Sequence, residues 1–309
     1  MSSNVSANVV VLFVMTIATI LTHPGSAHKD EFLACSVLLA LHASPIVRRE
    51  PTPDDLASSS VCVVDVGHAH QPELNNFDHH QLPKETPPTC SLSLVLQHLG
   101  LYQDARQFCE WLEPAEWFDC RGPETTGKWL GVSRETLTKL NSPIDITLLR
   151  RFALAERLEP GSPLWEMMRM IGTDLLEYVQ SLRTRLDFIA RHAQIWDLRL
   201  GGRDAQVVFL PRTEPLPDDP SMGLERFVDG RGLSERVVGL VYPDRRSAGY
   251  GLSRFRDNPR LDFTRIAGAP KVHFAHARGF VAKTSAHDVE ELKKLLLMAG
   301  GETSNANRE

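Results

Sequence analysis

The sequence is poor in cysteine, and this scarcity argues against a disulfide-stabilised protein and against a zinc ribbon. It has five cysteines in 309 residues, an odd number that is widely spread and contains no CxxC pair. Such a pattern indicates neither a disulfide framework nor a zinc ribbon, and it fits a reducing compartment. We therefore expect a cytoplasmic protein, with an organelle or the nucleus as alternatives if the source is eukaryotic.

An excess of positive charge is also absent. The formal net charge is -5, with 24% charged and 42% hydrophobic residues, which are ordinary values for a globular protein. This balance argues against a broad surface that coats nucleic acid, although it leaves room for a local basic groove. A chain of this length can bury an ample core, and two domains are the better expectation.

No apolar run is long enough for a complete membrane span. The run VVVLFVMTIATIL, residues 9–21, is too short for one and has no Lys or Arg before it. A signal peptide or anchor is the less favoured alternative. We expect a buried strand that follows an apolar leader, and no membrane association.

The first 80 residues have the pattern of a parallel α/β sheet. A β-branched run at 17–21 stops at Thr22, and residues 30–42 are predicted to form a helix with acids in its first turn. The short run VCVVDV, residues 61–66, suits a central strand of a parallel sheet. Because loops that leave the carboxyl ends of such strands line the ligand crevice, the loops 23–30 and 65–80 are expected to face one another.

The remaining patterns divide the chain into two parts. Helices are predicted at about 91–99, 103–112, 164–191 and 286–298, and strands at 207–210 and 237–242, with a proline-rich surface loop at 211–220. We place the domain boundary near residue 190. The predicted fold is therefore α/β, with a mostly parallel sheet in domain 1–190 and a smaller α+β domain at 191–309.

Four segments carry candidate metal ligands. In chain order they are His23 with His28 and Asp30, then Asp65 at a strand end, then Asp78-His79-His80, and then Asp119. Each alone is also explained as a turn, cap or polar surface residue. Together they supply imidazole and carboxylate without thiolate, the set expected for Mn²⁺ or Mg²⁺ and open to Zn²⁺ or Co²⁺. Two such ions about 3.5 to 4 Å apart can activate water and clamp a phosphoryl group, which indicates phosphoester hydrolysis.

These segments also resemble a known family. THPGSAHKDE at 22–31, VVDVG at 63–67 and FDHHQ at 77–81 are similar to motifs of the melanocyte-proliferating-gene (Myg-one) family, a branch of the DHH phosphoesterase superfamily. SLSLVLQHLG at 91–100, LEPGSPLW at 158–165 and HFAHARGFVAKT at 273–284 resemble later segments of it. The resemblance implies a DHH-type domain with a two-metal site and a smaller carboxy-terminal domain that closes over the substrate.

The resemblance also implies a role for each residue. Asp65 matches the carboxylate that bridges both metals, and His79 matches the ligand histidine of the DHH motif. His80 is implied to meet the scissile phosphate, while Asp78 orients its neighbours. His23, His28 and Asp30 match the first ligand motif, although the wider superfamily more often has an acid in place of His28. Asp119 matches the fourth motif, where the family usually continues with Asn-Gly and this chain continues with Cys-Arg-Gly.

Three residues of the carboxy-terminal segment are candidate substrate contacts. His276, Arg278 and Lys283 surround Gly279, and donors in a glycine-containing segment can approach phosphate oxygens closely. The alternative is that His276 only flanks a strand and that Arg278 pairs with a surface acid.

The resemblance implies a metal-dependent phosphodiesterase, a 3′–5′ exoribonuclease that hydrolyses RNA by a two-metal mechanism with Mn²⁺, or with Mg²⁺ or Co²⁺ as alternatives. Three other functions stay open. The chain could hydrolyse short oligonucleotides, cyclic dinucleotides or pyrophosphate. It could be a metal-binding scaffold without turnover. It could be a zinc hydrolase that uses His68 and His70. The oligomeric state is not predicted, and a homodimer is one option.

Overall fold

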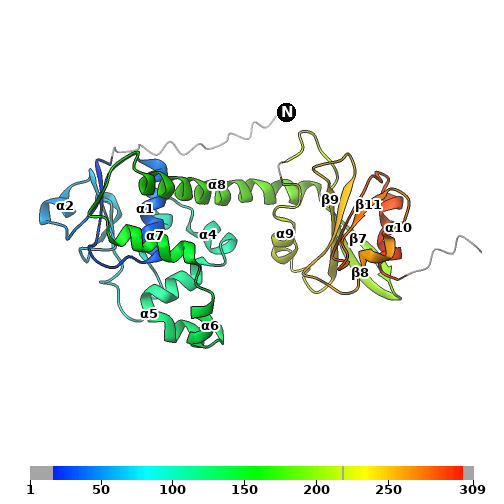
Figure 1. Cartoon of the computed structure of the whole chain (residues 1–309), viewed down its shortest axis with the longest axis horizontal. Coiled ribbons are helices and arrows are strands. Elements are labelled where there is room, and N and C mark those ends of the chain that lie inside the picture. The colour runs from blue at the N-terminus through cyan, green and yellow to red at the C-terminus, as the bar shows by residue number, and fades with distance from the viewer. Residues whose placement is uncertain (1–16, 218, 302–309) are drawn as a thin grey trace, which may run out of the picture. The chain divides into compact units, whose positions relative to one another are not determined.

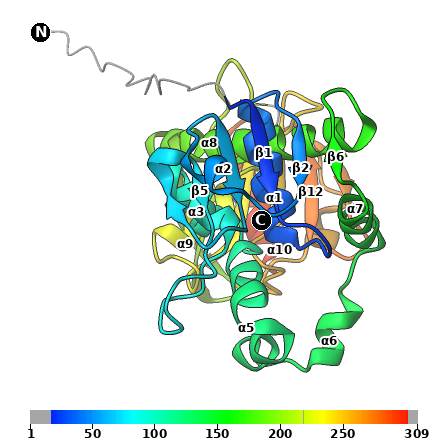
Figure 2. The same ribbon diagram turned by 90° about the vertical axis from the view of Figure 1, so that its left-hand side faces the viewer.

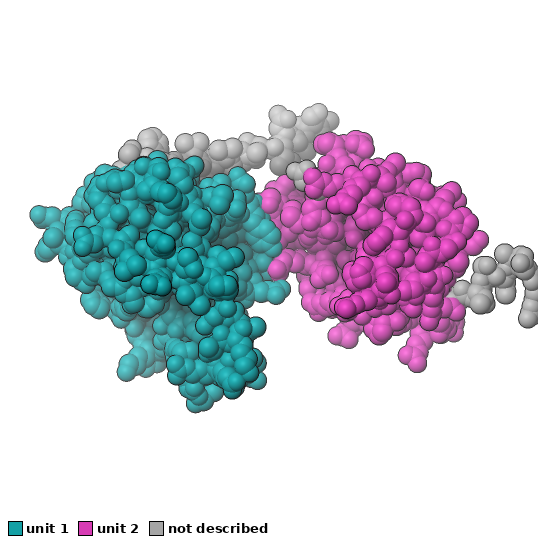
Figure 3. Space-filling model, in the orientation of Figure 1, with its two compact units in different colours: residues 1–180 teal, residues 181–309 magenta. Residues whose placement is uncertain are grey.

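The computed structural model describes residues 17–217 and 219–301. The chain divides into two compact units, residues 1–180 and residues 181–309 (Figure 3). The long helix α8 (Pro163–His192) begins in the first unit and ends in the second (Figure 1). The predicted boundary near residue 190 falls in the last turn of this helix. The predicted apolar leader, residues 1–16, lies outside the described residues.

Unit 1 is built on a six-stranded sheet with the order β4-β5-β3-β1-β2-β6. Its strands are β1 (Thr19–Thr22), β2 (Ile46–Arg48), β3 (Val61–Val64), β4 (His70–Gln71), β5 (Asn76–Phe77) and β6 (Arg157–Leu158). The four central strands run parallel, and the edge strands β4 and β6 run antiparallel to their neighbours. The prediction of a mostly parallel sheet is therefore confirmed. Ile20 and Leu21 of β1 are fully buried, as expected for a strand covered on both faces.

Helices cover both faces of this sheet. Helices α1 (Lys29–Leu41), α2 (Pro53–Ala57) and α3 (Ser91–His98) contact its strands. The unit also contains α4 (Tyr102–Phe108), α5 (Leu112–Leu130), α6 (Arg134–Lys139) and α7 (Pro143–Ala153), with a 3-10 turn at Pro72–Leu74. Leu21 and Val63 pack with Leu56 of α2 on one face, and α1 contacts β1, β3 and α3 (Figure 2). Helix α5 is kinked at Gly122, whose φ is 72°, because Pro123 cannot continue the hydrogen-bonded ladder.

A close approach between two backbones fixes the position of α1. A Cβ atom at Gly172 of α8 would lie 1.9 Å from the carbonyl oxygen of Ser36 in α1. Only glycine leaves room for α8 to pack this tightly. Helix α1, which carries Asp30 in its first turn, is thereby held against α8 at Ser36.

Unit 2 is a mostly antiparallel sheet between two layers of helix. Its strands, in the order β11-β12-β10-β9-β8-β7, are β7 (Gln194–Leu200), β8 (Arg203–Phe209), β9 (Val237–Pro243), β10 (Tyr250–Arg254), β11 (Val272–Ala275) and β12 (Val281–Thr284). Val207 and Phe209 face the core on the side of α10 (Val289–Ala299). Val208 faces α9 (Leu224–Gly230) and the end of α8. A 3-10 turn, Phe263–Ile266, also packs against α10. This unit has the α+β character that the sequence predicts.

Among residues 17–217 and 219–301, no helix has both the length and the apolarity that crossing a membrane requires.

Candidate metal centre

The carboxyl ends of three parallel strands bring the predicted ligand segments together. His23 follows β1, Asp65 follows β3, and the Asp78-His79-His80 triplet follows β5. Because these strands are parallel neighbours in the sheet, their carboxyl ends lie at one edge. The loops that were expected to face one another do so, since Nε2 of His23 lies 3.5 Å from Oδ2 of Asp65.

Asp65 occupies the middle of the cluster in an unusual backbone conformation. Its φ is 60°, a left-handed value that Asn, Asp and Gly tolerate better than other residues. The side chain is buried, its Oδ1 lies 3.1 Å from Nε2 of His79, and the same oxygen accepts a hydrogen bond of 2.6 Å from Ser91. Burial would raise the pKa of Asp65, but bonds with His23, His79 and Ser91 outweigh it and hold the pKa below its usual range.

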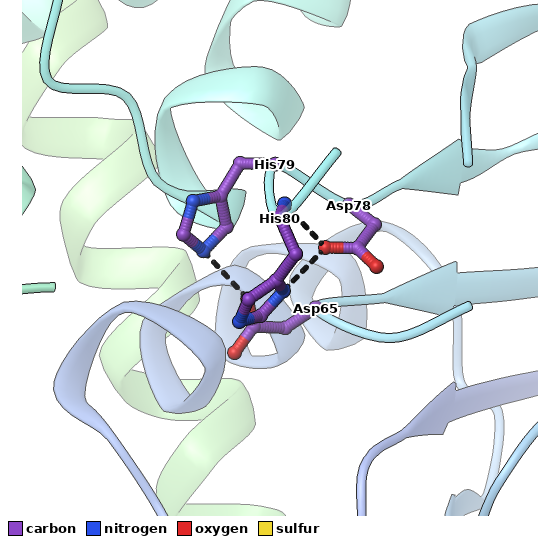
Figure 4. Close-up of side chains that lie close together, drawn as sticks. All are labelled: Asp65, Asp78, His79 and His80. Carbon is purple, nitrogen blue, oxygen red and sulfur yellow. Dashed lines mark hydrogen bonds and ion pairs between the residues drawn. The ribbon is translucent and has the colours of Figure 1, made fainter. Parts of the chain in front are cut away.

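His79 faces two carboxylates at once. Its Nε2 lies 3.1 Å from Asp65 and 2.8 Å from Oδ2 of Asp119, which arrives from α5 (Figure 4 shows His79 with Asp65). Neither Nε2 of His79 nor Oδ2 of Asp119 has a partner in hydrogen-bond geometry. Burial would lower the pKa of His79, but the proximity of Asp119 and Asp65 outweighs it and raises the pKa to about 12. This arrangement of a nitrogen between two carboxylates suits a shared cation.

Asp30 supplies a buried carboxylate without a partner. Both oxygens are inaccessible to solvent and accept no hydrogen bond, and the residue is 2% exposed. Burial, followed by the nearby carboxylates of Asp65 and Asp119, raises the pKa of Asp30 well above its usual range. An isolated buried carboxylate is costly, and a divalent cation among these acids would offset that cost.

His28 lies at the periphery of the cluster. It is the residue before the first turn of α1, and its side chain is half-exposed. Its Nδ1 lies 3.8 Å from Oδ1 of Asp119, and its ring centroid lies 5.8 Å from that of His23. The tertiary structure therefore brings His28 within reach of the same centre as Asp30 and Asp119.

Four groups of residues that share members could hold a metal ion, and within each group the ligand atoms lie within 4.8 Å of one another. They are Asp65-Asp78-His79-His80, His23-His28-Asp65, His79-Asp119-Cys120 and His28-Asp30-Asp119. All six predicted ligands fall in these groups. Imidazole and carboxylate donors, with buried oxygens that lack partners, fit a divalent cation such as Mn²⁺, Mg²⁺, Co²⁺ or Zn²⁺.

The carboxylate of Asp78 contacts two neighbouring residues, His68 and His80. Its Oδ1 accepts a hydrogen bond of 3.0 Å from the backbone of His80 and lies 2.7 Å from Nδ1 of the same residue (Figure 4). Its Oδ2 accepts a bond of 2.6 Å from the backbone of His68. Asp78 is buried, while the imidazole of His80 is half-exposed. The carboxylate raises the pKa of His80 and so favours its charged form.

A buried ion pair that no sequence pattern indicated lies beside the site. Glu31 is fully buried, contacts Nε2 of His23, and lies 3.1 Å from Nη2 of Arg48. Arg48 also donates to the backbone oxygens of His23, Ser26 and Phe152. Burial would lower the pKa of His23, but Asp65 and Glu31 raise it to about 10. The acid at 31 follows Asp30 and could have been noticed, whereas nothing local marks Arg48.

The predicted substrate contacts of unit 2 lie in and beside one tight hairpin. His276 and Arg278 occupy the loop between β11 and β12, where the backbone nitrogen of Arg278 donates to Nδ1 of His276 over 3.1 Å. Arg278 is exposed. Lys283 lies in β12, and its Nζ is 2.6 Å from the buried carboxylate of Asp244, so its charge is already compensated.

His68 and His70 do not belong to any of the groups of close ligand atoms found in the described part of the chain. His68 contributes its backbone to the site through Asp78.

Comparison with known proteins supports the resemblance over part of the chain. Residues 19–101 match the family model MYG1_exonuc, described as an uncharacterised protein family, UPF0160. The predicted resemblance to this family is confirmed over this segment. The mouse (Mus musculus) protein named MYG1 exonuclease is 44% identical over 62 residues, and the human (Homo sapiens) one is 42% identical over 62 residues. Each match spans 19% of this chain and only 16% of the relative.

One solved structure is also similar. It is RecJ in complex with Mn²⁺ from Thermus thermophilus, 13% identical, with 92% of this chain and 52% of that chain covered. The TM-score is 0.27, which is too low to carry any argument about fold or function.

Proposed function

We propose that this chain is a metal-dependent phosphodiesterase that acts as an exonuclease. The observation that carries the proposal is the meeting of Asp65, His79 and Asp119 beside the unpartnered buried carboxylate of Asp30. The name exonuclease borne by the relatives that match part of this chain supports the same reaction class.

Six residues would hold two divalent ions, with Mn²⁺ preferred and Mg²⁺ or Co²⁺ as alternatives. They are His23, His28, Asp30, Asp65, His79 and Asp119. When bound, such ions lower the pKa of a water molecule and neutralise the charge of a phosphodiester. Asp65 has the central place in this set, because its two oxygens face His23 and His79 separately.

His80 and Asp78 act on the substrate side. Asp78 holds Nδ1 of His80 and favours the imidazolium form, while the ring stays half-exposed. A charged imidazole is a strong donor toward a phosphate oxygen. His80 therefore meets the scissile phosphate, and Asp78 orients it.

The proposed substrate is RNA, degraded from its 3′ end. His276, Arg278 and Lys283 are the proposed contacts of unit 2 with the phosphate backbone. Arg278 is the strongest candidate of the three, because its guanidinium is exposed and can bind a phosphate. Short oligonucleotides, cyclic dinucleotides and pyrophosphate are the alternative substrates, since the same chemistry serves all of them.

The test is an assay of the purified full chain with Mn²⁺. Substrates are RNA labelled at either end, single-stranded DNA, short oligoribonucleotides and pyrophosphate. We expect release of mononucleotides from the 3′ end of RNA, abolished in Asp65→Asn and unchanged in Asp174→Asn, which makes the same substitution on the exposed surface of α8. If wild type and Asp65→Asn are equally inert on all substrates, the enzyme proposal fails. Native mass spectrometry showing bound metal without turnover would instead support a scaffold.

A further inference from the structure

Cys120 and Arg121 hold the loop that follows the DHH segment. The Sγ of Cys120 accepts a hydrogen bond of 3.2 Å from the backbone nitrogen of Thr89 and donates one of 2.8 Å to the Thr89 carbonyl. The Nη2 of Arg121 donates to the carbonyl oxygens of Lys84 and Thr86 over 2.6 and 2.8 Å. Two consecutive residues of α5 thus anchor the 84–89 loop at both ends.

The same sulfur reaches a proposed metal ligand. Sγ of Cys120 lies 3.9 Å from Nδ1 of His79, while Nε2 of that ring faces Asp65 and Asp119. A histidine that offers one nitrogen to a metal is normally held by a partner on its other nitrogen. Cys120 is that partner, since its sulfur lies beside Nδ1 of His79. It is also the one cysteine of the five that is not buried.

The 84–89 loop connects to a second proposed ligand. It runs directly into α3, whose first residue, Ser91, donates a hydrogen bond of 2.6 Å to Asp65. The loop begins shortly after His80. Its two ends therefore lead to the two residues that face each other across the site, His79 and Asp65.

We propose that Cys120 and Arg121 are positioning residues that fix His79 and Asp65 for metal binding. Cys120 sets the plane of the His79 ring through Nδ1, and together with Arg121 it holds the 84–89 loop in place. This inference rests on the proposed metal centre. Neither residue is assigned any contact with substrate.

The expected effect is a loss of metal affinity without loss of fold. Removing an outer partner of a ligand histidine typically weakens metal binding by about 10- to 100-fold. Cys120→Ala removes the contacts with Thr89 and His79 together. Cys120→Ser keeps a donor and an acceptor at nearly the same place, so it should recover most of the affinity. Arg121→Ala loosens only the loop and should cost less than Cys120→Ala.

The test measures Mn²⁺ affinity by titration calorimetry on the full chain. Cys109→Ala serves as the control, because it removes a thiol that is buried elsewhere in unit 1. Circular dichroism checks that the variants fold. We expect Cys120→Ala to bind about 10- to 100-fold more weakly, with Cys120→Ser close to wild type and the control unchanged. Wild-type affinity in Cys120→Ala, or an equal loss in Cys120→Ser, overturns the proposal.

A second measurement tests the anchoring of the 84–89 loop independently of metal binding. Amide hydrogen exchange at Thr89 in metal-free protein reports the loop anchor directly, and it should accelerate in Cys120→Ala but not in Cys109→Ala. If wild type binds no Mn²⁺, the metal-centre proposal fails by itself. Unchanged exchange at Thr89 in Cys120→Ala then shows that Cys120 does not hold the loop.

Discussion

Nε2 of His79 lies 2.8 Å from Oδ2 of Asp119, although one residue follows β5 and the other lies within α5. The contact depends on the first half of α5 returning to the edge where the parallel strands end. It joins the proposed fourth ligand segment to the other three. The site therefore depends on helix packing as much as on the sheet.

Substitution of Asp65 by Asn should separate metal binding from folding. Asn tolerates the left-handed φ of 60°, so the fold should survive. Mn²⁺ affinity should fall by more than the roughly 10- to 100-fold typical of losing an outer partner, because a proposed direct ligand is lost. Calorimetric titration and thermal unfolding measure the two effects. Asp65→Ala should lose about 1 kcal/mol of additional stability through backbone strain, and equal stability of both variants would contradict this account of the strained position.

Substitution of Arg48 by Met should destabilise unit 1. It removes the guanidinium from the fully buried carboxylate of Glu31, which keeps only His23 as a cationic partner, and breaking a buried pair costs about 3 to 5 kcal/mol. Urea unfolding, followed by tryptophan fluorescence, measures the free energy of unfolding. The double variant Arg48→Met with Glu31→Leu should be more stable than Arg48→Met alone, because the buried carboxylate that lost the guanidinium is gone. A double variant that loses the sum of both single effects would argue against a coupled pair.

Substitution of Gly279 by Ala should destabilise the hairpin that carries His276 and Arg278. Gly279 has a φ of 69°, and a Cβ there would lie 2.2 Å from Oδ1 of Asp262. The combined strain and overlap should cost about 1 to 3 kcal/mol. Gly268→Ala is the matched control in the same unit, since no atom lies within 4 Å of its Cβ position. Chemical denaturation of both variants decides the matter, and equal stability of the two would refute the steric argument.

The stability of unit 2 should depend on pH through Asp244. Burial would raise the pKa of this carboxyl, but hydrogen bonds from Lys283 and Ser247 outweigh it and lower the pKa. A carboxyl with a lowered folded-state pKa stabilises the fold above its unfolded pKa, and this stability is lost as the pH falls through the folded value. Because Lys283 is about a third exposed, the effect should be on the order of 1 kcal/mol. In Lys283→Met the free energy of unfolding should fall less between neutral and acidic pH than in wild type. Denaturation at a series of pH values measures this difference.

Local patterns predicted the regular elements near the site well. The helix expected at 30–42 is α1 (Lys29–Leu41), and the one expected at about 164–191 is α8 (Pro163–His192). The strand expected at 61–66 ends at Val64, because Asp65 leaves the extended conformation. The helix expected at 103–112 ends at Phe108, and Leu112 begins α5 instead. A helix that contains Gly122 and Pro123 was not expected, since both residues disfavour helix interiors.

The sequence by itself determined which residues could bind metal and that several would follow buried strands, because an apolar run followed by His or Asp is a local pattern. It also indicated the parallel sheet, whose carboxyl ends share one edge. Only the tertiary structure decided that Asp119 reaches His79, that Arg48 compensates Glu31, and that Cys120 contacts Nδ1 of His79. These contacts join distant segments through the packing of α1, α5 and β2, and no local pattern in the chain encodes which buried faces will meet.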